Sequence, residues 1–171
     1  MRYSFLLLLL TSTLAAQDEL PGFGVKAGLP LSSTSSESLF RWTAGFSGEG
    51  PLFWHLSFEG DALIRKFSLG NIKQTDWDFP MLAKYRFRVK RFRPFLESGL
   101  SLSYESQEAY GGGGVHVTTY RYDTGPVAGA GLQFRRGRLR FEPELRFTWL
   151  YQPYVSGSNG VIITPMVGLR F

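Results

Sequence analysis

Two histidines are the only imidazoles in this chain of 171 residues, so histidine-dependent chemistry must use His55 or His116. Ser106, Glu105 and Glu108 precede His116, which lies just after a run of four glycines. A serine hydrolase needs a serine, a histidine and an orienting acid within hydrogen-bond reach of one another. These residues therefore raise the alternative of a membrane-embedded, lipid-modifying hydrolase, although sequence spacing alone does not bring the groups together.

Pairs of carboxylates, Glu59 with Asp61 and Glu142 with Glu144, are the second feature that suggests chemistry. Residues two apart lie on one face of a β-strand, and neighbouring carboxylates can perform acid–base catalysis. Basic residues alternate with them, however, so we expect a salt-bridge network and no catalytic residue. With no cysteine and two separated histidines, we expect no metal or cofactor. The expected network consists of Glu59, Asp61, Arg65, Lys84, Arg86, Glu97, Arg140, Glu142, Glu144 and Arg146.

The charged residues alternate with apolar residues along the chain, with a period of two. From Leu139 to Trp149 every odd position is apolar and nearly every even position is charged. Successive side chains of a strand point to opposite faces, so such a strand has one apolar and one charged face. The last segment, 160–171, repeats this alternation and ends on Phe171. The charged residues therefore lie on strands whose other face is apolar.

Eight segments show this pattern, which predicts an all-β fold. An even number of antiparallel strands lets the first pair with the last, which removes both exposed edges. We therefore predict a closed, eight-stranded, up-and-down transmembrane β-barrel whose narrow interior is filled by side chains. The predicted strands are 22–30, 39–49, 51–66, 76–90, 93–105, 119–135, 138–151 and 160–171.

The predicted connections alternate in length. Tight turns are expected at 48–51, 90–93 and 135–138, and longer polar loops at 32–38, 68–75, 106–118 and 152–159. The loop 106–118 contains Gly111–Gly114, which we interpret as a flexible linker because no Lys-Ser/Thr or helix follows it. Short turns at one end and long loops at the other are typical of bacterial outer-membrane barrels.

Alternation alone does not decide whether the apolar face meets lipid or lines a cavity, because a soluble lipocalin-type barrel has the same period. Glycine and serine on the charged face favour a crowded, charged interior, and aromatic residues near strand ends favour membrane interfaces. We therefore expect the apolar face outside, with an exported lipocalin-like barrel binding an apolar ligand as the alternative. The residues expected to face lipid are Trp42, Trp54, Phe79, Phe141, Phe147, Trp149, Leu169 and Phe171.

The N-terminus has the features of a secretory signal. Arg2 precedes an apolar run, and small residues end at Ala15 and Ala16. We predict a signal peptide at 1–16, export through the Sec pathway, cleavage after Ala15 or Ala16, and one barrel domain at 17–171. The formal net charge is +5, but the basic residues are spread along the strands, so we expect no nucleic-acid partner.

Phe79-Pro80-Met81-Leu82-Ala83-Lys84-Tyr85 resembles the P-L-L-x-K-Y strand of a family of small outer-membrane β-barrel domains that includes PorT-like and OmpA-transmembrane-like proteins. The stretches Pro94–Leu96, Gly125–Leu132 and Gly168–Phe171 resemble later strands of this family. The resemblance is diffuse, covers roughly residues 20–171, and implies an eight-stranded barrel in the outer membrane of a diderm bacterium. It supplies no family-wide catalytic residue.

Together these features predict a non-enzymatic integral outer-membrane protein with a structural, adhesive or partner-binding role. Its expected partners are outer-membrane lipid, the barrel-assembly machinery during insertion, and a periplasmic or extracellular protein.

Overall fold

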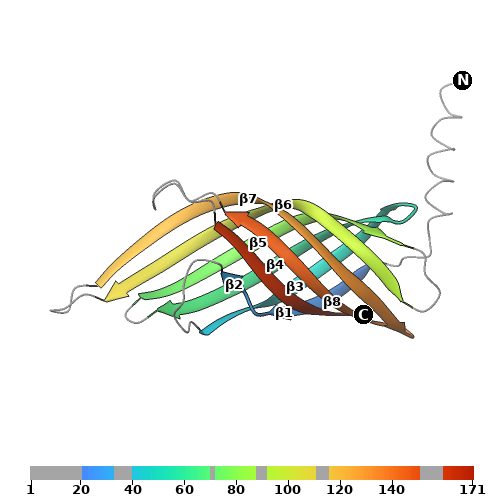
Figure 1. Cartoon of the computed structure of the whole chain (residues 1–171), viewed down its shortest axis with the longest axis horizontal. Coiled ribbons are helices and arrows are strands. Elements are labelled where there is room, and N and C mark those ends of the chain that lie inside the picture. The colour runs from blue at the N-terminus through green and yellow to red at the C-terminus, as the bar shows by residue number, and fades with distance from the viewer. Residues whose placement is uncertain (1–20, 33–39, 70–71, 88–91, 111–115, 151–159) are drawn as a thin grey trace, which may run out of the picture.

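The computed structural model describes residues 21–32, 40–69, 72–87, 92–110, 116–150 and 160–171 (Figure 1). The predicted signal peptide at 1–16 and most of the predicted loops 32–38 and 152–159 lie outside these ranges. The described residues include no helix that is long and apolar enough to span a membrane.

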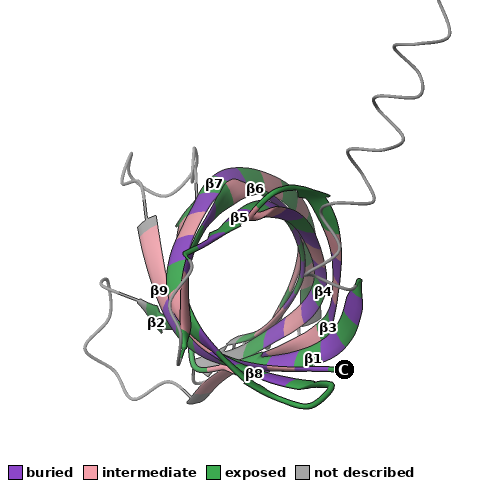
Figure 2. Ribbon diagram, turned by 90° about the vertical axis from the view of Figure 1, so that its right-hand side faces the viewer, coloured by how far each residue is buried: buried purple, intermediate pink, exposed green. Residues whose placement is uncertain are grey.

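The described strands form one antiparallel sheet that closes into a barrel, as the sequence predicts (Figures 1 and 2). The first strand, β1 (Gly22–Gly28), and the short β2 (Leu31–Ser32) both pair with the last strand, so the barrel has eight strand positions. Each other strand pairs with its neighbours in sequence. These strands are β3 (Phe40–Phe53), β4 (Leu56–Leu69), β5 (Ile72–Arg86), β6 (Arg93–Tyr110), β7 (His116–Arg136), β8 (Leu139–Leu150) and β9 (Gly160–Arg170).

The turn predicted at 48–51 is wrong. Gly48 pairs with Gly60 and Pro51 with Ser57, so these residues belong to a β3–β4 ladder that turns at Trp54 and His55. Glycine and proline indicated a turn here, but a register shift between Pro51 and Phe53 accommodates the missing proline N–H within the hairpin.

Two of the predicted long loops are also wrong in extent. The β4–β5 ladder continues to the pair Leu69 and Ile72, and the β6–β7 ladder continues to Tyr110 and His116. The segments 68–75 and 106–118 resembled loop sequence because most of their residues are polar or glycine, yet Ile72, Thr75, Tyr110, Val117 and Thr118 suit strands. The tight turn expected within 135–138 is present at Gly137 and Arg138, with Gly137 at φ 65°. Residues 90 and 91 of the remaining predicted turn are outside the described ranges.

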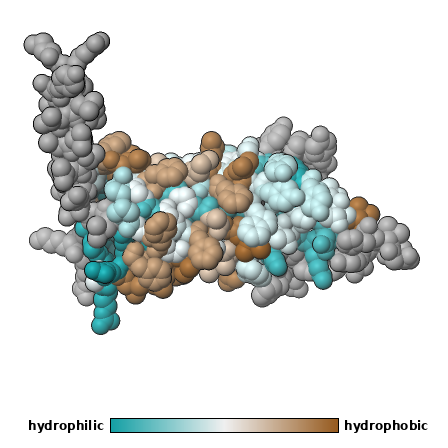
Figure 3. Space-filling model, turned by 180° about the vertical axis from the view of Figure 1, so that it is seen from behind, coloured by the Kyte–Doolittle hydropathy of each residue, from teal (hydrophilic) through white to brown (hydrophobic). Residues whose placement is uncertain are grey.

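The two faces of the wall differ as the alternation predicts. Buried and exposed residues succeed one another along the strands in Figure 2. Charged side chains are buried in the interior, whereas large apolar side chains such as Phe79 and Leu100 are exposed on the outside. Figure 3 shows apolar side chains over much of the wall and paler ones toward the extension of β6 and β7. The alternative of an apolar interior, as in a lipocalin-like barrel, does not fit this arrangement.

Two glycines of the inner face occupy positions where neighbouring strands approach closely. A Cβ on Gly45 would lie 2.0 Å from the carbonyl oxygen of Ala62, and one on Gly99 would lie 1.9 Å from that of Met81. No larger residue fits there without moving a neighbouring strand. These glycines therefore permit the close strand packing of a narrow barrel.

Candidate functional site

Glu59 on β4 is the centre of a charged network in the barrel interior, and it is fully buried. It accepts hydrogen bonds from Lys26 and Lys84. Arg170 Nη2 lies 2.7 Å from its Oε2, and Arg146 Nη2 lies 3.4 Å from its Oε1. A buried carboxylate is very costly unless cations compensate it. Here four cations from β1, β5, β8 and β9 do so, which ties distant strands to one carboxylate.

A second cluster surrounds Glu49 on β3, toward the short turns. Arg86 Nη2 donates to Glu49 Oε2 at 2.7 Å, and Arg170 Nη1 donates to the same oxygen at 2.5 Å. Arg86 Nη1 also donates to Ser57 at 2.7 Å, and Arg140 Nη1 lies 4.0 Å from Glu49 Oε2. Because Arg170 contacts both Glu49 and Glu59, the two clusters form one continuous network.

Arg146 on β8 connects the centre of the network to three further acids. Its Nε donates to Glu97 at 3.1 Å, its Nη1 to Asp61 at 2.8 Å and its Nη2 to Glu144 at 2.9 Å. Lys26 Nζ also donates to Glu144 at 3.0 Å. The planar guanidinium has its donors in a fixed fork, so one arginine can bind acids from several strands at once.

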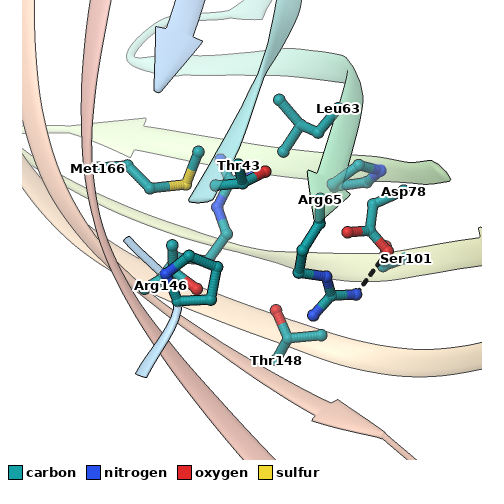
Figure 4. A pocket seen from close by; sticks show the side chains of 11 residues that line it. Thr43, Leu63, Arg65, Asp78, Ser101, Arg146, Thr148 and Met166 are labelled. Carbon is teal, nitrogen blue, oxygen red and sulfur yellow. Dashed lines mark hydrogen bonds and ion pairs between the residues drawn. The ribbon is translucent and has the colours of Figure 1, made fainter. Parts of the chain in front are cut away.

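A small cavity with a mixed polar and apolar lining lies between Arg146 and the ion pair of Arg65 with Asp78 (Figure 4). Arg65 Nη2 donates to Asp78 Oδ1 at 2.8 Å, and Ser103 Oγ donates to the same oxygen at 2.5 Å. The cavity has an empty volume of about 340 Å³ when space open to solvent is counted. Its lining includes Arg65, Asp78, Arg146 and the hydroxyls of Thr43, Ser101, Thr148 and Thr164, a set that suits water.

The interior charges nearly balance. Among the described residues, the buried bases are Lys26, Arg65, Lys84, Arg86, Arg140, Arg146 and Arg170, and the buried acids are Glu49, Glu59, Asp61, Asp76, Asp78, Glu97, Glu142 and Glu144. The two sets differ by one charge. Two groups of three acids, Glu49-Glu59-Glu142 and Glu59-Glu97-Glu144, have oxygens within 4.8 Å of one another. Lysine and arginine side chains already contact these oxygens, so the groups resemble a salt-bridge network more than a metal site.

The structure brings all ten predicted network residues into this interior, each at most 7% exposed. Sequence reasoning placed Lys26, Asp78 and Arg170 on the charged face but left them out of the network. It missed Glu49 because that residue was placed in a turn. The signal available in the sequence was its separation of two residues from Ser47, which places both residues on the same, buried face of a strand.

The residues expected to face lipid occupy the outside of the barrel, with one correction. Phe79, Phe141 and Trp149 are exposed on β5 and β8. Trp42, Phe147 and Leu169 are half-buried on the same outer surface, and Phe171 follows β9 with 62% exposure. Trp54 was expected in a strand but lies in the β3–β4 turn, at φ 50° and 85% exposed. The turn occurs later in the chain than glycine and proline indicated.

A row of aromatic side chains crosses the outer surface of three strands. Trp77, Tyr104 and Tyr122 are paired partners on β5, β6 and β7. Tyr104 contacts the ring of Tyr122 at 5.0 Å and stacks on Tyr120 at 6.0 Å between centroids. On one side of this row the outer face of β5 is apolar, and on the other side it carries Thr75 and Lys73. We call Trp77, Tyr104 and Tyr122 the aromatic row.

The histidines occupy different places from those expected. His55 was expected on the charged face of a strand, but it lies in the β3–β4 turn with its ring 6.3 Å from that of Tyr85. His116 was expected in a loop, but it is the first residue of β7 and pairs with Tyr110, because the β6–β7 ladder is longer than predicted. Among the side chains that the structure describes, no histidine hydrogen-bonds to a serine; the side chain of His116 is outside this set.

The chain matches no protein-family model and no curated protein sequence, so its resemblance to the PorT-like family remains a prediction. Solved structures do match. Neisserial surface protein A (NspA) aligns with a TM-score of 0.72 and 17% identity over 88% of this chain and 95% of that one. The outer membrane enzyme PagL aligns with a TM-score of 0.59 and 17% identity, over 88% and 98% of the two chains. The N-terminal β-barrel domain of Pseudomonas aeruginosa OprF aligns with a TM-score of 0.55 and 13% identity, over 88% and 97%. These similarities show a shared barrel fold.

Proposed function

We propose that this chain is an integral outer-membrane protein whose barrel spans the membrane and whose role is structural, adhesive or partner-binding. The observation that carries the proposal is the inversion of polarity: a buried charged interior and an exposed apolar wall. Soluble proteins seldom expose a continuous apolar surface of this kind. A lipid-embedded barrel has such a surface by necessity.

The height of the apolar wall supports this location. On β5 and the residue after it, the outward side chains from Phe87 to Trp77 are uncharged, and these two residues are ten positions apart. Ten residues span roughly 34 Å along a strand, or about 26 Å along the barrel axis at a tilt of about 40°. The apolar band of outer-membrane barrels is about 25 Å tall. The aromatic row would then mark the outer interface of the membrane.

The fold of the structural neighbours is consistent with this location, and these neighbours include both an enzyme, PagL, and a surface protein, NspA. Among the described interior residues, the carboxylates of Glu59, Glu97 and Glu144 form ion pairs with lysines and arginines, as expected for a structural network. We therefore propose a non-enzymatic role, in which the barrel holds the segments outside the membrane in place. Chain export, the barrel-assembly machinery and a periplasmic or extracellular protein partner belong to the same proposal.

Quenching of tryptophan fluorescence by brominated lipids tests the membrane placement. The four tryptophans of the chain are replaced by phenylalanine, and single tryptophans are then introduced at Met81, within the band, and at Ser106, beyond the aromatic row. We expect bromine deep in the acyl chains to quench the tryptophan at 81 strongly and the one at 106 weakly. Equal quenching at both positions, or none at either, would contradict the proposal.

A further inference from the structure

The β7 strand continues well beyond the strand that follows it. Its pairing with β8 covers residues 127–136, whereas its pairing with β6 runs without a register shift from His116 to Gln133. Trp149 and Leu150, the last residues of β8, fall opposite Pro126 and Gly125 in this register, so residues 117–124 have β6 on one side and, within the described part of the chain, no strand on the other. Figure 1 shows this extension of β6 and β7 beyond the ends of β8 and β9. We call residues 117–124 the free edge.

The turn at Gly137 and Arg138 indicates which backbone groups face the free edge. Arg136 and Leu139 flank this two-residue turn, so they form a hydrogen-bonded pair and both direct N–H and C=O toward each other. Backbone groups alternate sides along a strand, so even-numbered β7 residues face the β8 side. Pro126 is one of these even-numbered residues, so the N–H that it lacks would have pointed to the β8 side.

Three residues of the free edge therefore present both backbone groups outward, namely Thr118, Tyr120 and Tyr122. Thr124 also directs its backbone groups to the β8 side, but its N–H donates to the Asp123 carboxylate at 2.9 Å. This N–H is therefore not available to an added strand. An antiparallel strand paired with Thr118, Tyr120 and Tyr122 would make about six hydrogen bonds.

Within the part of the chain that the structure describes, residues 117–124 lack the usual protections of an exposed edge. Proteins block such edges with lysine, proline, bulges or a covering segment. Here the sequence is Val-Thr-Thr-Tyr-Arg-Tyr-Asp-Thr, rich in residues that favour strands, and the ladder with β6 has no bulge. Tyr120 and Tyr122 are 63% and 75% exposed beside the edge. An added strand would find both backbone partners and aromatic surface.

A second copy of this chain in the same membrane does not have the right geometry to pair with the free edge. A symmetric pair would be related by a twofold axis along the membrane normal, which keeps both β7 strands running toward the membrane. At a tilt of about 40° the two strands would cross at about 80°, too far from antiparallel to form a ladder. The occupant must therefore be free to align with β7.

We propose that the free edge binds an extended segment of another protein, which adds an antiparallel strand with apolar or aromatic side chains against Tyr120 and Tyr122. This mode of recognition takes its affinity from the backbone and its specificity from alternate side chains. The extracellular position of the edge rests on the proposed function. Strand addition itself requires only the geometry of β7.

The test uses the full chain folded in detergent and a fluorescein-labelled peptide of seven alternating threonine and valine residues, with a lysine at each end. Fluorescence anisotropy measures binding to the wild type, to Tyr120→Pro and to Tyr120→Thr. The proline removes an N–H that faces the free edge, whereas the threonine removes only the aromatic side chain. We expect Tyr120→Pro to weaken binding at least about tenfold and Tyr120→Thr less than about threefold.

The same peptide with an N-methyl group on every residue is the matched control and should not bind, because neither of its edges can donate hydrogen bonds. Equal binding to the proline variant, or no binding to the wild type, would overturn the proposal. Binding that appears only after deletion of residues 152–158 would show that the chain covers its own edge and would likewise overturn it. Heat-dependent migration of each variant in gels separates the two proposals: a barrel that inserts but binds no peptide refutes strand addition alone.

Discussion

Replacing Glu59 by glutamine tests the interior network at its centre. The Oε2 atom of Glu59 accepts hydrogen bonds from Lys84 and Arg170, and Oε1 contacts Lys26 and Arg146. In the amide, one of these two atoms becomes an NH₂ group that cannot accept, so either orientation loses two charge-assisted bonds. At about 1.5–3 kcal/mol each, the loss is about 3–6 kcal/mol, in line with about 3–5 kcal/mol for breaking a buried ion pair.

Urea-induced unfolding of the barrel refolded into lipid vesicles measures this loss. Glu105→Gln is a matched control, because Glu105 is only half-buried and accepts from the neutral Gln74; we expect a change below about 1 kcal/mol. Adding Lys84→Met to Glu59→Gln removes a cation that has lost one of its three carboxylate partners and keeps Glu97 and Glu142. The double variant should therefore be at least about 1 kcal/mol more stable than the sum of the single losses predicts. A loss below about 1 kcal/mol for Glu59→Gln, or strict additivity, would refute this account of the network.

The barrel wall and its turns give three further predictions. Gly99→Ala should destabilise the barrel by about 2 kcal/mol or more in the same unfolding assay, because the added Cβ would overlap the Met81 carbonyl, whereas Gly50→Ala, with open space around it, should change little. Phe79→Arg should cost about 2–4 kcal/mol of folding free energy in lipid vesicles because it places a cation in the apolar band, and Thr75→Arg, beyond the aromatic row, should cost about 1 kcal/mol or less; equal costs would argue against the band. Trp54→Gly should raise stability by about 1 kcal/mol, because glycine adopts the φ of 50° without strain, and a lower urea midpoint would contradict this reading of the turn.

The sequence predicted the architecture well because alternation is a direct consequence of strand geometry. From Leu139 to Trp149 each odd residue is apolar, and the structure places those side chains outside and the charged ones inside. Register follows from the same pattern, since a slip by one residue would move charges into the apolar face. The burial of the interior charges could therefore be predicted without knowing which acid pairs with which base.

The connections were harder to predict because local turn chemistry competes with contacts distant in sequence. Gly48, Gly50 and Pro51 indicate a turn, but Glu49 between them is bound by Arg86 on β5 and Arg170 on β9, both distant in sequence. The extension of β6 and β7 was missed for the opposite reason. Its outward residues beyond the aromatic row are polar, such as Ser106 and Thr118, so it lacks the apolar alternation that marks the wall.

The partners within the network were beyond sequence reasoning. Arg146 and Asp61 are 85 residues apart and meet only when the sheet closes. Alternation places both side chains in the interior, but the stagger between strands decides which charges lie at the same height. That stagger depends on how the first and last strands pair, for which the sequence has no local signal.

Cell fractionation followed by gel electrophoresis of heated and unheated samples tests the central claim most directly. A closed, lipid-embedded barrel with a buried ionic interior should be recovered with the outer membrane and should migrate differently before and after boiling in SDS. Recovery as a soluble periplasmic protein with no change in migration would contradict the account.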